Sequence, residues 1–532
     1  MEKRLTHVWE ALELVFVAAR EYANPFRDVS LLVEFSGPGG EQLIVPGFWD
    51  GGNVWRARFA PTSIGLWSWR SQCSDSGDEG LHGLQDRVEA VPWPPAEIEK
   101  NPLRRGFVRV HPSGRYFEYA DGTPFYWLGD TLWAVYTGHC REDDLALYLS
   151  DRKDKGFTVI QVVAGRPAGA MAEGDATDEV KHANEGGLPY IDRYERINPA
   201  YFQYFERKIR IILDAGFIPC LNGMWAWDIR MGVPAAKEYW RYLIARYAAF
   251  NLLWSISGEY FFVPDEEAWR EIGREIHRCD PYAHPTSAHS TAPHSGSRHF
   301  QGEDWYDFNL VQVGHVLAFR QLFETLPLSD YHARPVKPSI MSESWYENHP
   351  NCEGTERRRI NDGDVRFAAY TSLLQGCVGQ TYGAHGIWSW YGEPGGWSWA
   401  DDYHRPSPWR EDLDLPGSRQ MGYLRALMES VGWWKLAPHP EFVTSPQGTH
   451  VYCAADPGRE YVVYAAGGPA DIFVFVPGGA GESYEGRWFD PRTGQWSAVE
   501  KHEFFPYGSW WRWTTVTPGA GDWVLILKAR VD

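Results

Sequence analysis

The stretch FTVIQVVAG (157–165) is followed along the chain by YFQYFERKIRIILDAG (201–216) and FIPCLNGMW (217–225). The first and third runs are short and apolar, as buried strands are, whereas the second run repeats its apolar residues at helical spacing. Gly216 lies where a helix commonly ends, directly before the third run. The order strand, helix, strand predicts a parallel sheet in an α/β protein.

The same alternation continues on both sides of this unit. Helix-like runs such as DDLALYLSDRKDKG (143–156) and AAKEYWRYLIARYAAF (235–250) separate further short apolar runs. We expect strands at residues 124–131, 157–165, 217–225, 251–260, 284–290, 308–315, 338–344 and 379–388. Eight strand–helix units over roughly 300 residues predict a (β/α)8 TIM barrel. A doubly wound open sheet is the alternative, but WLGDTLW (127–133) is not the Gly-rich phosphate loop that such folds carry after the first strand.

The segments before and after the predicted barrel have a different pattern. Short alternating runs broken by Gly, Pro and Asp, such as QLIVPGFWDGGNVWRARFAP (42–61), are typical of an antiparallel sandwich. Similar runs return near the C-terminus, for example EYVVYAAG (460–467). We therefore expect an N-terminal β-sandwich over residues 1–98, the barrel over 99–437 and a C-terminal β-sandwich over 438–532.

The composition limits the kinds of partner that the chain can bind and indicates the cellular compartment in which it functions. Its 532 residues include 51 basic and 70 acidic side chains, and the resulting net charge of −19 disfavours binding to nucleic acid or anionic membranes. The 28 Trp, 28 Tyr and 26 Phe residues fill cores in part, but flat aromatic rings also stack on the faces of sugars. Secretory-signal and membrane-span patterns are not evident, and seven scattered cysteines indicate a reducing, cytoplasmic setting. The sequence is compatible with a homo-oligomer but does not require one.

Two carboxylates follow strongly apolar predicted strands. Glu259 ends NLLWSISGE and Glu343 ends PSIMSE, which places them at the C-terminal ends of predicted strands four and seven. Barrel enzymes carry their catalytic residues at these ends. Cleavage of a glycosidic bond requires one protonated and one ionised carboxyl group, so we expect this pair to be catalytic. Carboxylates that form ion pairs or lie at helix N-termini are the alternative.

Further polar and aromatic residues lie at the ends of the predicted strands or shortly after them. As candidate substrate-binding residues we name Asp130, Arg166, Asn222, Trp225, His315, Trp345, Glu347, Tyr382, His385 and Trp388. Purely structural roles are the alternative: Asp130 would cap the following helix, His385 would be a buried histidine that bonds to the backbone, and the tryptophans would pack in the core. Glu347 follows Glu343 by four residues and competes with it or supports it.

Metal and cofactor chemistry have little support in the sequence. His284, His289, His294 and His299 recur every five residues, a spacing that suits neither one face of a helix nor one face of a strand. HExxH, Walker A, GxSxG and dinucleotide-binding patterns do not occur. We therefore expect a carbohydrate substrate and neither a metal nor a cofactor.

Four motifs resemble one family of enzymes. FYWLGDTLW (125–133), NLLWSISGEY (251–260), KPSIMSESWYEN (337–348) and VRFAAYTSLLQGCVGQTYGAHGIWSW (365–390) are similar to the apiosidase-like glycoside hydrolases, which include glycoside hydrolase family 140. The segment WRARFAPTSIGLWSWR (55–70) resembles a sandwich domain often found ahead of these barrels.

At the other end of the chain, RWFDPRTGQW (487–496) resembles a small sandwich that is described in some proteins as a collagen-binding domain. That description does not transfer a function to this chain, because one sandwich fold serves many functions.

The resemblance implies a retaining mechanism, with Glu259 as acid/base and Glu343 as nucleophile. Two carboxyl groups in these roles are expected about 5–5.5 Å apart, and the pKa of Glu259 is expected to be raised by its negative neighbour and by apolar walls. The family-140 pattern has Gly-Gly-Asp-Arg where this chain has Ser257-Gly258-Glu259-Tyr260. Because of this difference, the resemblance does not identify the sugar on which the chain acts. The alternatives are a non-catalytic carbohydrate-binding protein on a TIM-barrel scaffold, and a lyase or transglycosidase.

Overall fold

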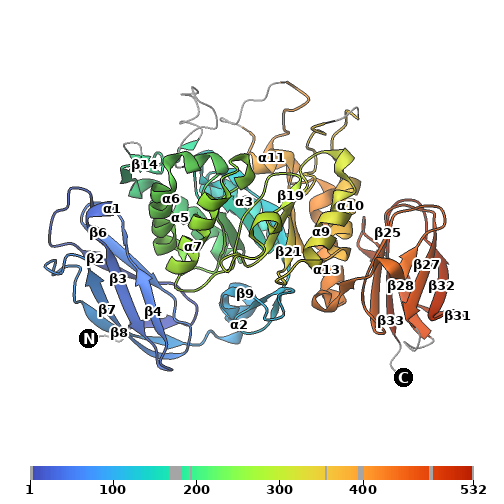
Figure 1. The fold of residues 1–532 in the computed structure, drawn as a ribbon, viewed down its shortest axis with the longest axis horizontal. Coiled ribbons are helices and arrows are strands. Elements are labelled where there is room, and N and C mark those ends of the chain that lie inside the picture. The colour runs from blue at the N-terminus through green and yellow to red at the C-terminus, as the bar shows by residue number, and fades with distance from the viewer. Residues whose placement is uncertain are drawn as a thin grey trace.

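The computed structural model describes residues 4–166, 182–191, 194–353, 356–392, 401–477 and 483–529. Figure 1 shows a central region of helices and strands with β-sheets on either side of it. The sheets of the N-terminal part are drawn in blue at the left and those of the C-terminal part in red at the right.

The central region is built on one large sheet. In the described residues, nine strands pair in the order β18, β17, β16, β13, β12, β22, β21, β20, β19. The pairing is parallel throughout except between β19 and β20. The strands are β12 (Trp127–Thr131), β13 (Val159–Val163), β16 (Ile218–Asn222), β17 (Leu253–Ser255), β18 (Thr286–Ser287), β19 (His294–Ser295), β20 (Asn309–Gln312), β21 (Ser339–Glu343) and β22 (Cys377–Tyr382).

Each predicted strand run overlaps one parallel strand of this sheet, so the predicted α/β class is confirmed. Of the nine strands in this sheet, only β19, a two-residue strand, was not predicted. A single parallel bridge between His289 and Leu310 joins the segment after β18 to β20. The sheet is therefore curled, and its two end regions approach one another.

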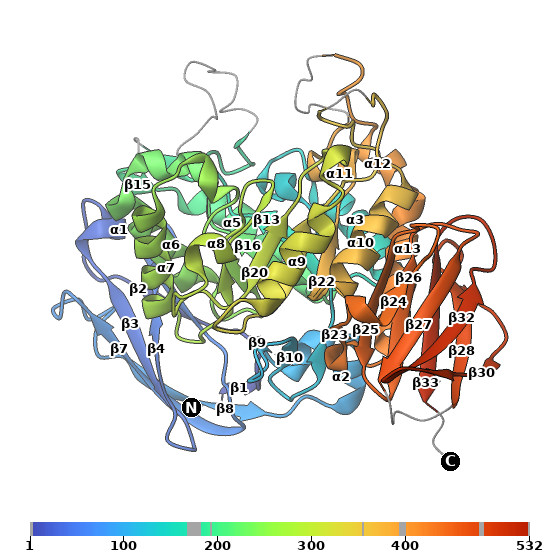
Figure 2. The same cartoon turned by 45° about the vertical axis from the view of Figure 1, so that its right-hand side comes forward.

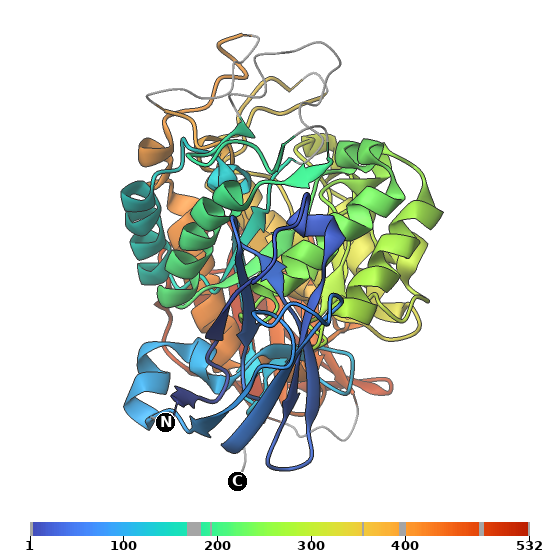
Figure 3. The same cartoon turned by 90° about the vertical axis from the view of Figure 1, so that its left-hand side faces the viewer.

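Helices follow the strands and surround the sheet, as Figures 1 and 3 show. The longer ones are α3 (Glu142–Asp154), α5 (Pro199–Asp214), α6 (Val233–Tyr247), α7 (Glu266–Cys279), α9 (Leu322–His332), α10 (Asp362–Leu374) and α13 (Pro416–Ser430). The predicted 201–216 helix is α5: Phe202, Phe205, Ile209 and Ile212 recur at helical spacing and are fully buried. Short helices are α1 (Pro25–Asp28), α2 (Pro95–Lys100), α8 (Ser297–Phe300), α11 (His385–Trp388) and α12 (Trp409–Asp412).

The N-terminal part consists of two facing sheets with a shared core. One has the order β1, β8, β7, β3, β4 and the other β2, β6, β5. Their bounds are β1 (Arg4–His7), β2 (Leu12–Val17), β3 (Leu31–Ser36), β4 (Gln42–Pro46), β5 (Phe48–Trp49), β6 (Val54–Phe59), β7 (Gly65–Cys73) and β8 (Gln85–Val91). The rings of Phe35 and Phe59 stack between the sheets at 3.8 Å. Two small sheets follow, from β9 (Val108–Val110), β10 (Phe117–Tyr119) and β11 (Pro124–Phe125), and from β14 (Tyr190–Ile191) and β15 (Arg196–Ile197).

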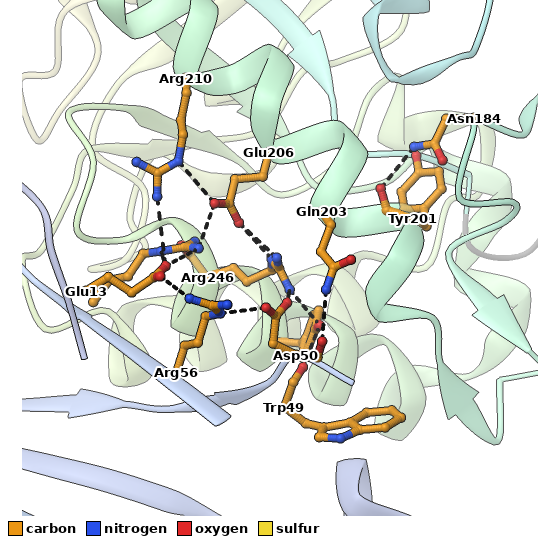
Figure 4. A network of polar contacts seen from close by, with 12 residues as sticks. Glu13, Trp49, Asp50, Arg56, Asn184, Tyr201, Gln203, Glu206, Arg210 and Arg246 are labelled. Carbon is orange, nitrogen blue, oxygen red and sulfur yellow. Dashed lines mark hydrogen bonds and ion pairs between the residues drawn. The ribbon is translucent and has the colours of Figure 1, made fainter. Parts of the chain in front are cut away.

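Buried ion pairs fasten the N-terminal sheets to helices α5 and α6 (Figure 4). Arg246 of α6 donates to Asp50 at 2.8 Å and to Glu206 of α5 at 2.9 Å. Arg58 of β6 also donates to Glu206, at 2.7 Å. Arg58 and Arg246 are almost fully buried, and removing one partner from such a network leaves an unpaired buried charge. The sandwich is thus held in one position on the central region.

The C-terminal part packs on the opposite side, against α10 (Figure 2). Its larger sheet has the order β23, β25, β26, β33, β28, β29, with β30 on β28, and its smaller sheet β24, β27, β32, β31. These strands are β23 (Ala437–Pro438), β24 (Val443–Thr444), β25 (Val451–Asp456), β26 (Glu460–Ala465), β27 (Asp471–Pro477), β28 (Ser483–Asp490), β29 (Gln495–Trp496), β30 (Glu500–Glu503), β31 (Phe505–Tyr507), β32 (Trp510–Val516) and β33 (Trp523–Ala529). Arg366 of α10 pairs with Asp522 at 2.8 Å, and Tyr370 stacks on Tyr464.

Among the residues that the structure describes, no helix combines the length and the apolar character that crossing a membrane requires.

Candidate active site

Glu343 is the last residue of β21, and its carboxylate is held by two histidines. Nε2 of His289 lies 3.1 Å from Oε2, and Nε2 of His315 lies 3.3 Å from Oε1. Only 7% of Glu343 is exposed. The hydroxyl of Tyr346 lies near this carboxylate and hydrogen-bonds to the hydroxyl of Thr131 at 3.2 Å. Both carboxylate oxygens therefore have a donor on the protein, although the group lies at the end of an apolar strand.

The hydrogen bonds around His315 determine which ring nitrogen carries the proton. The backbone N–H of Tyr346 donates to Nδ1 of His315 at 3.3 Å, so Nδ1 is an acceptor. The proton of the neutral ring is then on Nε2, which donates to Glu343. Burial by itself raises the pKa of Glu343, but the hydrogen bonds and the electrostatic attraction of His289 and His315 outweigh burial and lower this pKa well below the usual range. Glu343 is consequently ionised.

Glu259 lies four residues beyond the end of β17, in a backbone conformation that is rare for its residue type. Its φ is 44°, in the left-handed region that a residue with a Cβ seldom occupies, and such strain concentrates at functional sites. Burial is the largest cause, and the charge of Glu343 the second, of a rise in the pKa of Glu259 to about 8. The raised pKa was expected from the sequence, but burial rather than the negative neighbour is the larger cause. Glu259 is protonated at neutral pH.

Trp225, which follows β16, packs directly beside Glu259. A Cβ added at Gly258 would lie 2.2 Å from the Trp225 ring, so the residue before Glu259 has no room for a side chain. Trp225 and Gly258 form a parallel bridge, which keeps the Trp225 side chain close to Glu259. This packing gives a physical reason for glycine at position 258.

Gln312 connects the two glutamates. It is the register partner of Glu343 across β20 and β21, and its Nε2 lies 3.4 Å from Oε1 of Glu259. Trp133 extends the same cluster, with its ring 5.5 Å from Trp225 and 5.4 Å from His289. The structure thus gathers predicted residues from four separate strand ends around one point.

Sequence reasoning missed Gln312, Tyr346 and Trp133 as site residues, and considered His289 only as a metal ligand. One signal was available: Gln312 and His289 are polar residues at or near the ends of short strand runs, as Glu259 and Glu343 are. Their partners lie on strands distant in sequence, so spacing alone does not reveal the contacts.

A row of histidines leads from Glu343 to helix α11. The ring of His315 lies 4.1 Å from that of His349, which lies 4.2 Å from that of His385. Nε1 of Trp388 donates to Nδ1 of His385 at 3.3 Å. Burial is the main cause that lowers the pKa of His349 well below the usual value and that of His385 to about 3, so both rings are neutral. Two further predicted residues, His385 and Trp388, thus adjoin the site through His349.

In two of the predicted substrate-binding residues, the charged group forms an ion pair with another side chain of the protein. Asp130 is fully buried and accepts from Tyr148 at 2.8 Å and from Arg152 of α3 at 2.5 Å. Arg166 donates to Asp228 at 3.0 Å. The structure does not bring Asp130 to the Glu259–Glu343 cluster, because its carboxylate is bound to α3. Arg166 lies at the edge of residues 167–181, which are outside the described residues.

The remaining predicted residues are buried in the walls of the central region. Trp345 donates to the backbone of Val316 at 3.1 Å and packs on Phe323. Asn222 donates to the backbone of Val162 at 3.3 Å.

Glu347 and Tyr382 form a hydrogen-bonded pair in the same walls. The Tyr382 hydroxyl donates to the Glu347 carboxylate at 2.6 Å, and the backbone N–H of Gly417 donates to the same group at 3.2 Å. Burial raises the pKa of Glu347 to about 7. Glu347 thus forms its hydrogen bonds with Tyr382 and Gly417, and not with the two histidines that bind Glu343.

The histidine run at five-residue spacing does not form a cluster. His284 pairs with Asp280, His289 with Glu343, and His299 with Tyr260. Within the described residues, no group of three or more His, Cys, Asp or Glu side chains is arranged to hold a metal ion.

A family model described as "Apiosidase-like, catalytic domain" matches residues 111–435, which contain the central sheet and the whole cluster around Glu259 and Glu343. The chain belongs to this family. It is an apiosidase-like glycoside hydrolase, and its substrate is therefore a carbohydrate. A second model, of a domain of unknown function, matches residues 6–74 of this enzyme. No curated protein matches the chain.

Solved structures share the fold of the enzyme. A glycoside hydrolase of family 5 from Bacteroides vulgatus ATCC 8482 is 23% identical, with a TM-score of 0.70 over 80% of this chain and 94% of that one. A candidate glycoside hydrolase from the same organism is 19% identical, with a TM-score of 0.74 over 99% of this chain and 100% of the other. The second likeness includes the sheets on both sides of the central region.

Proposed function

We propose that this enzyme is a retaining glycoside hydrolase in which Glu259 is the acid/base and Glu343 the nucleophile. One observation carries the proposal: two neighbouring glutamates, one at the end of β21 and one shortly after β17, have surroundings that favour opposite protonation states. Such a pair supplies the proton donor and the anion that glycosidic cleavage requires. Family membership favours this hydrolase over a non-catalytic carbohydrate-binding protein.

In the first step the Glu343 carboxylate attacks the anomeric carbon while Glu259 donates its proton to the leaving oxygen. The bond from the sugar to the leaving group breaks, and a glycosyl ester forms on Glu343. The charge of Glu343 is then lost, so the pKa of Glu259 falls and Glu259 becomes a base. In the second step Glu259 takes a proton from water, which attacks the anomeric carbon and releases Glu343.

The neighbours of the two glutamates have roles that follow from their contacts. His289 and His315 orient and ionise Glu343, and Gln312 and Trp225 orient Glu259. Trp225 and Trp133 are the rings nearest the pair, and we assign to them contact with the sugar.

The proposal includes the predicted architecture. We infer that the curled sheet is a (β/α)8 barrel that closes between β18 and β20, with the His289–Leu310 bridge as support. In this barrel β17 and β21 are strands four and seven. We also propose the domain limits 1–98, 99–437 and 438–532, because the sheets of the three parts do not share strands among the described residues.

The stereochemistry of the product tests the mechanism. We expect the first sugar released to have the anomeric configuration of the substrate, because two displacements at one carbon restore it. Proton NMR of the reaction within the first minutes, before mutarotation, records the anomer. The opposite anomer as first product would contradict a glycosyl ester on Glu343 and would indicate direct attack by water.

The pH dependence of kcat/KM tests the assigned protonation states. Glu259 must be protonated, and its pKa is raised to about 8, so activity is lost as the pH rises through about 8. Glu343 must be ionised, and its lowered pKa moves the acid limb below the reference value of about 4.3 for glutamate. Initial rates measured from pH 4 to 10 locate the alkaline limb, and the acid limb should lie below this range, so activity should not fall steeply toward pH 4. An alkaline limb near pH 5 would contradict the role of Glu259.

A further inference from the structure

Two aromatic side chains lie side by side just beyond Glu259, where β16 and β17 end. Trp227 belongs to the short helix η3 (Ala226–Met231), which follows β16, and Phe262 belongs to η4 (Tyr260–Phe262), which follows Glu259 directly. Their ring centroids are 5.6 Å apart and their planes differ by 15°, so the two rings are stacked with an offset. The two-step mechanism uses neither ring.

Phe262 is the more open of the two rings. It is 47% exposed, and among the described residues of the central region (99–437) no other Phe, Tyr or Trp is exposed to this extent. The guanidinium of Arg230 lies over the Trp227 ring, 5.3 Å from its centroid, so Phe262 offers the open aromatic face. A substrate that covered this face would remove apolar surface from water, which stabilises the complex.

The backbone around Phe262 holds its ring in a fixed place. The N–H of Phe262 donates to the carbonyl oxygen of Glu259 at 3.0 Å. One residue further on, the carbonyl oxygen of Val263 accepts from Nε1 of the buried Trp269 at 3.0 Å. The aromatic face is thus fixed relative to Glu259, and a preformed surface loses little conformational freedom when it binds a ligand.

In the proposed barrel these rings lie on the opposite side of the mouth from the nucleophile. β16 is four positions from β21 in the pairing order of the sheet, which is half of the way around eight strands. The cleaved bond joins the anomeric carbon, which Glu343 attacks, to the oxygen that Glu259 protonates. The leaving group therefore extends past Glu259 toward the ends of β16 and β17, where Trp227 and Phe262 lie.

The openness of the ring pair favours a sugar over an aromatic leaving group. Within the described residues Trp227 is the only ring that contacts Phe262, so a ligand stacked on Phe262 keeps its other face and its edges in water. The hydroxyl groups of a sugar are hydrated in that position, whereas an aromatic ligand would leave an apolar face exposed. The carbohydrate-cleaving family of the chain points to the same class of ligand.

We propose that Phe262, backed by Trp227, binds the leaving-group sugar, the unit whose oxygen Glu259 protonates. This inference rests on the proposed role of Glu259 as the acid. The substrate is then a linkage between two sugars and not the glycoside of a small alcohol. Because Phe262 contacts only the departing unit, it selects substrates by their leaving group and not by the sugar that becomes bonded to Glu343.

Two substrates that share one glycone test the contact. The glycone is the one that the parent enzyme cleaves fastest in a panel of dinitrophenyl glycosides, and the second substrate is the glycosyl fluoride of the same sugar. Neither leaving group needs a proton, and only dinitrophenol has a ring. We expect Phe262→Ala to lower kcat/KM about tenfold on the dinitrophenyl glycoside and less than about twofold on the fluoride. Phe262→Tyr keeps the ring and should restore the parent value.

Transfer to free sugars tests the nature of the ligand. The glycosyl ester formed from the fluoride reacts with water or, by the reverse of the first step, with a sugar that occupies the leaving-group site. The acceptors are glucose, galactose, xylose, rhamnose and arabinose at high concentration. We expect at least one of them to yield a disaccharide with the parent enzyme. Phe262→Ala should form about tenfold less of it relative to hydrolysis.

Phe505→Ala is the matched control, because Phe505 is a 66% exposed phenylalanine on β31 of the C-terminal part. It should behave as the parent does with both substrates and all acceptors. A structural role of Phe262 in placing Glu259 would move the alkaline limb of the pH profile, which Phe262→Ala should leave in place. Thermal unfolding checks that each variant folds.

Three outcomes would overturn the assignment of Phe262: equal losses on the fluoride and the dinitrophenyl glycoside, no loss on the dinitrophenyl glycoside, or transfer to no sugar by a parent enzyme that retains configuration. Failure of the catalytic proposal has a different signature. The parent enzyme would then release the first sugar from the fluoride with inverted configuration, and the comparison of the two substrates in Phe262→Ala would still report on the leaving-group contact.

Discussion

Replacing Glu343 by alanine is expected to lower kcat by about 10⁴-fold or more, because no nucleophile remains to form the glycosyl ester. The fold should persist, at a cost of about 1–3 kcal/mol for each histidine donor left without its acceptor. Those donors are Nε2 of His289 and Nε2 of His315. Rates on aryl glycosides, together with thermal unfolding, measure both effects.

Sodium azide distinguishes a lost nucleophile from a damaged site. In Glu343→Ala the small anion occupies the vacated space and attacks the anomeric carbon once, so the product is a glycosyl azide of inverted configuration. Asp330→Asn is the matched control: Asp330 is a buried carboxyl that accepts hydrogen bonds from Ser295 and Ser297, outside the site. It should keep near-parent kcat. If Glu343→Ala stayed active while Glu347→Ala did not, the nucleophile would be Glu347.

Glu259→Ala is expected to show a loss that depends on the leaving group. On glycosides with poor leaving groups, kcat/KM should fall by about 10²–10⁴-fold, because no acid protonates the departing oxygen. On dinitrophenyl glycosides the first step needs no proton, so kcat/KM should change little. The second step lacks its base with either kind of substrate, so the glycosyl ester on Glu343 should accumulate as a burst on dinitrophenyl glycosides, where the first step stays fast.

Azide again separates the roles. It should rescue Glu259→Ala and yield a glycosyl azide of retained configuration, because it attacks the ester already formed on Glu343. Glu266→Gln is the control, since Glu266 is a partly exposed glutamate of α7 that pairs with Arg270. A uniform loss on all leaving groups, with no response to azide, would assign Glu259 to structure rather than to proton transfer.

The element order of the fold was predictable because local patterns carry it. Apolar runs of strand length alternate with helical periodicity between residues 124 and 388, and the parallel sheet follows that order. The exception is β19, whose two residues are too short to leave a pattern. The flanking sheets were foreseen for the same reason, since alternating runs and turn residues are local features.

Prediction of the site was less complete. Glu259 and Glu343 stood out because a carboxylate after an apolar strand is unusual in any single stretch of sequence. Asp130 has the same appearance, at the end of β12, yet its carboxylate is bound to Tyr148 and Arg152. The sequence shows that a side chain lies at the end of a strand. It does not show which group that side chain contacts, because the contacting group comes from another element.

The sequence by itself determined the α/β order of the chain, its flanking sheets and the positions of two glutamates at strand ends, since periodicity and spacing are properties of neighbouring residues. Only the tertiary structure decided their environments. His289 and His315 reach Glu343 from separate segments, and Gln312 reaches Glu259 from β20. Burial and charge at a point in space, and hence the opposite pKa shifts of the two glutamates, arise from residues far apart in the chain.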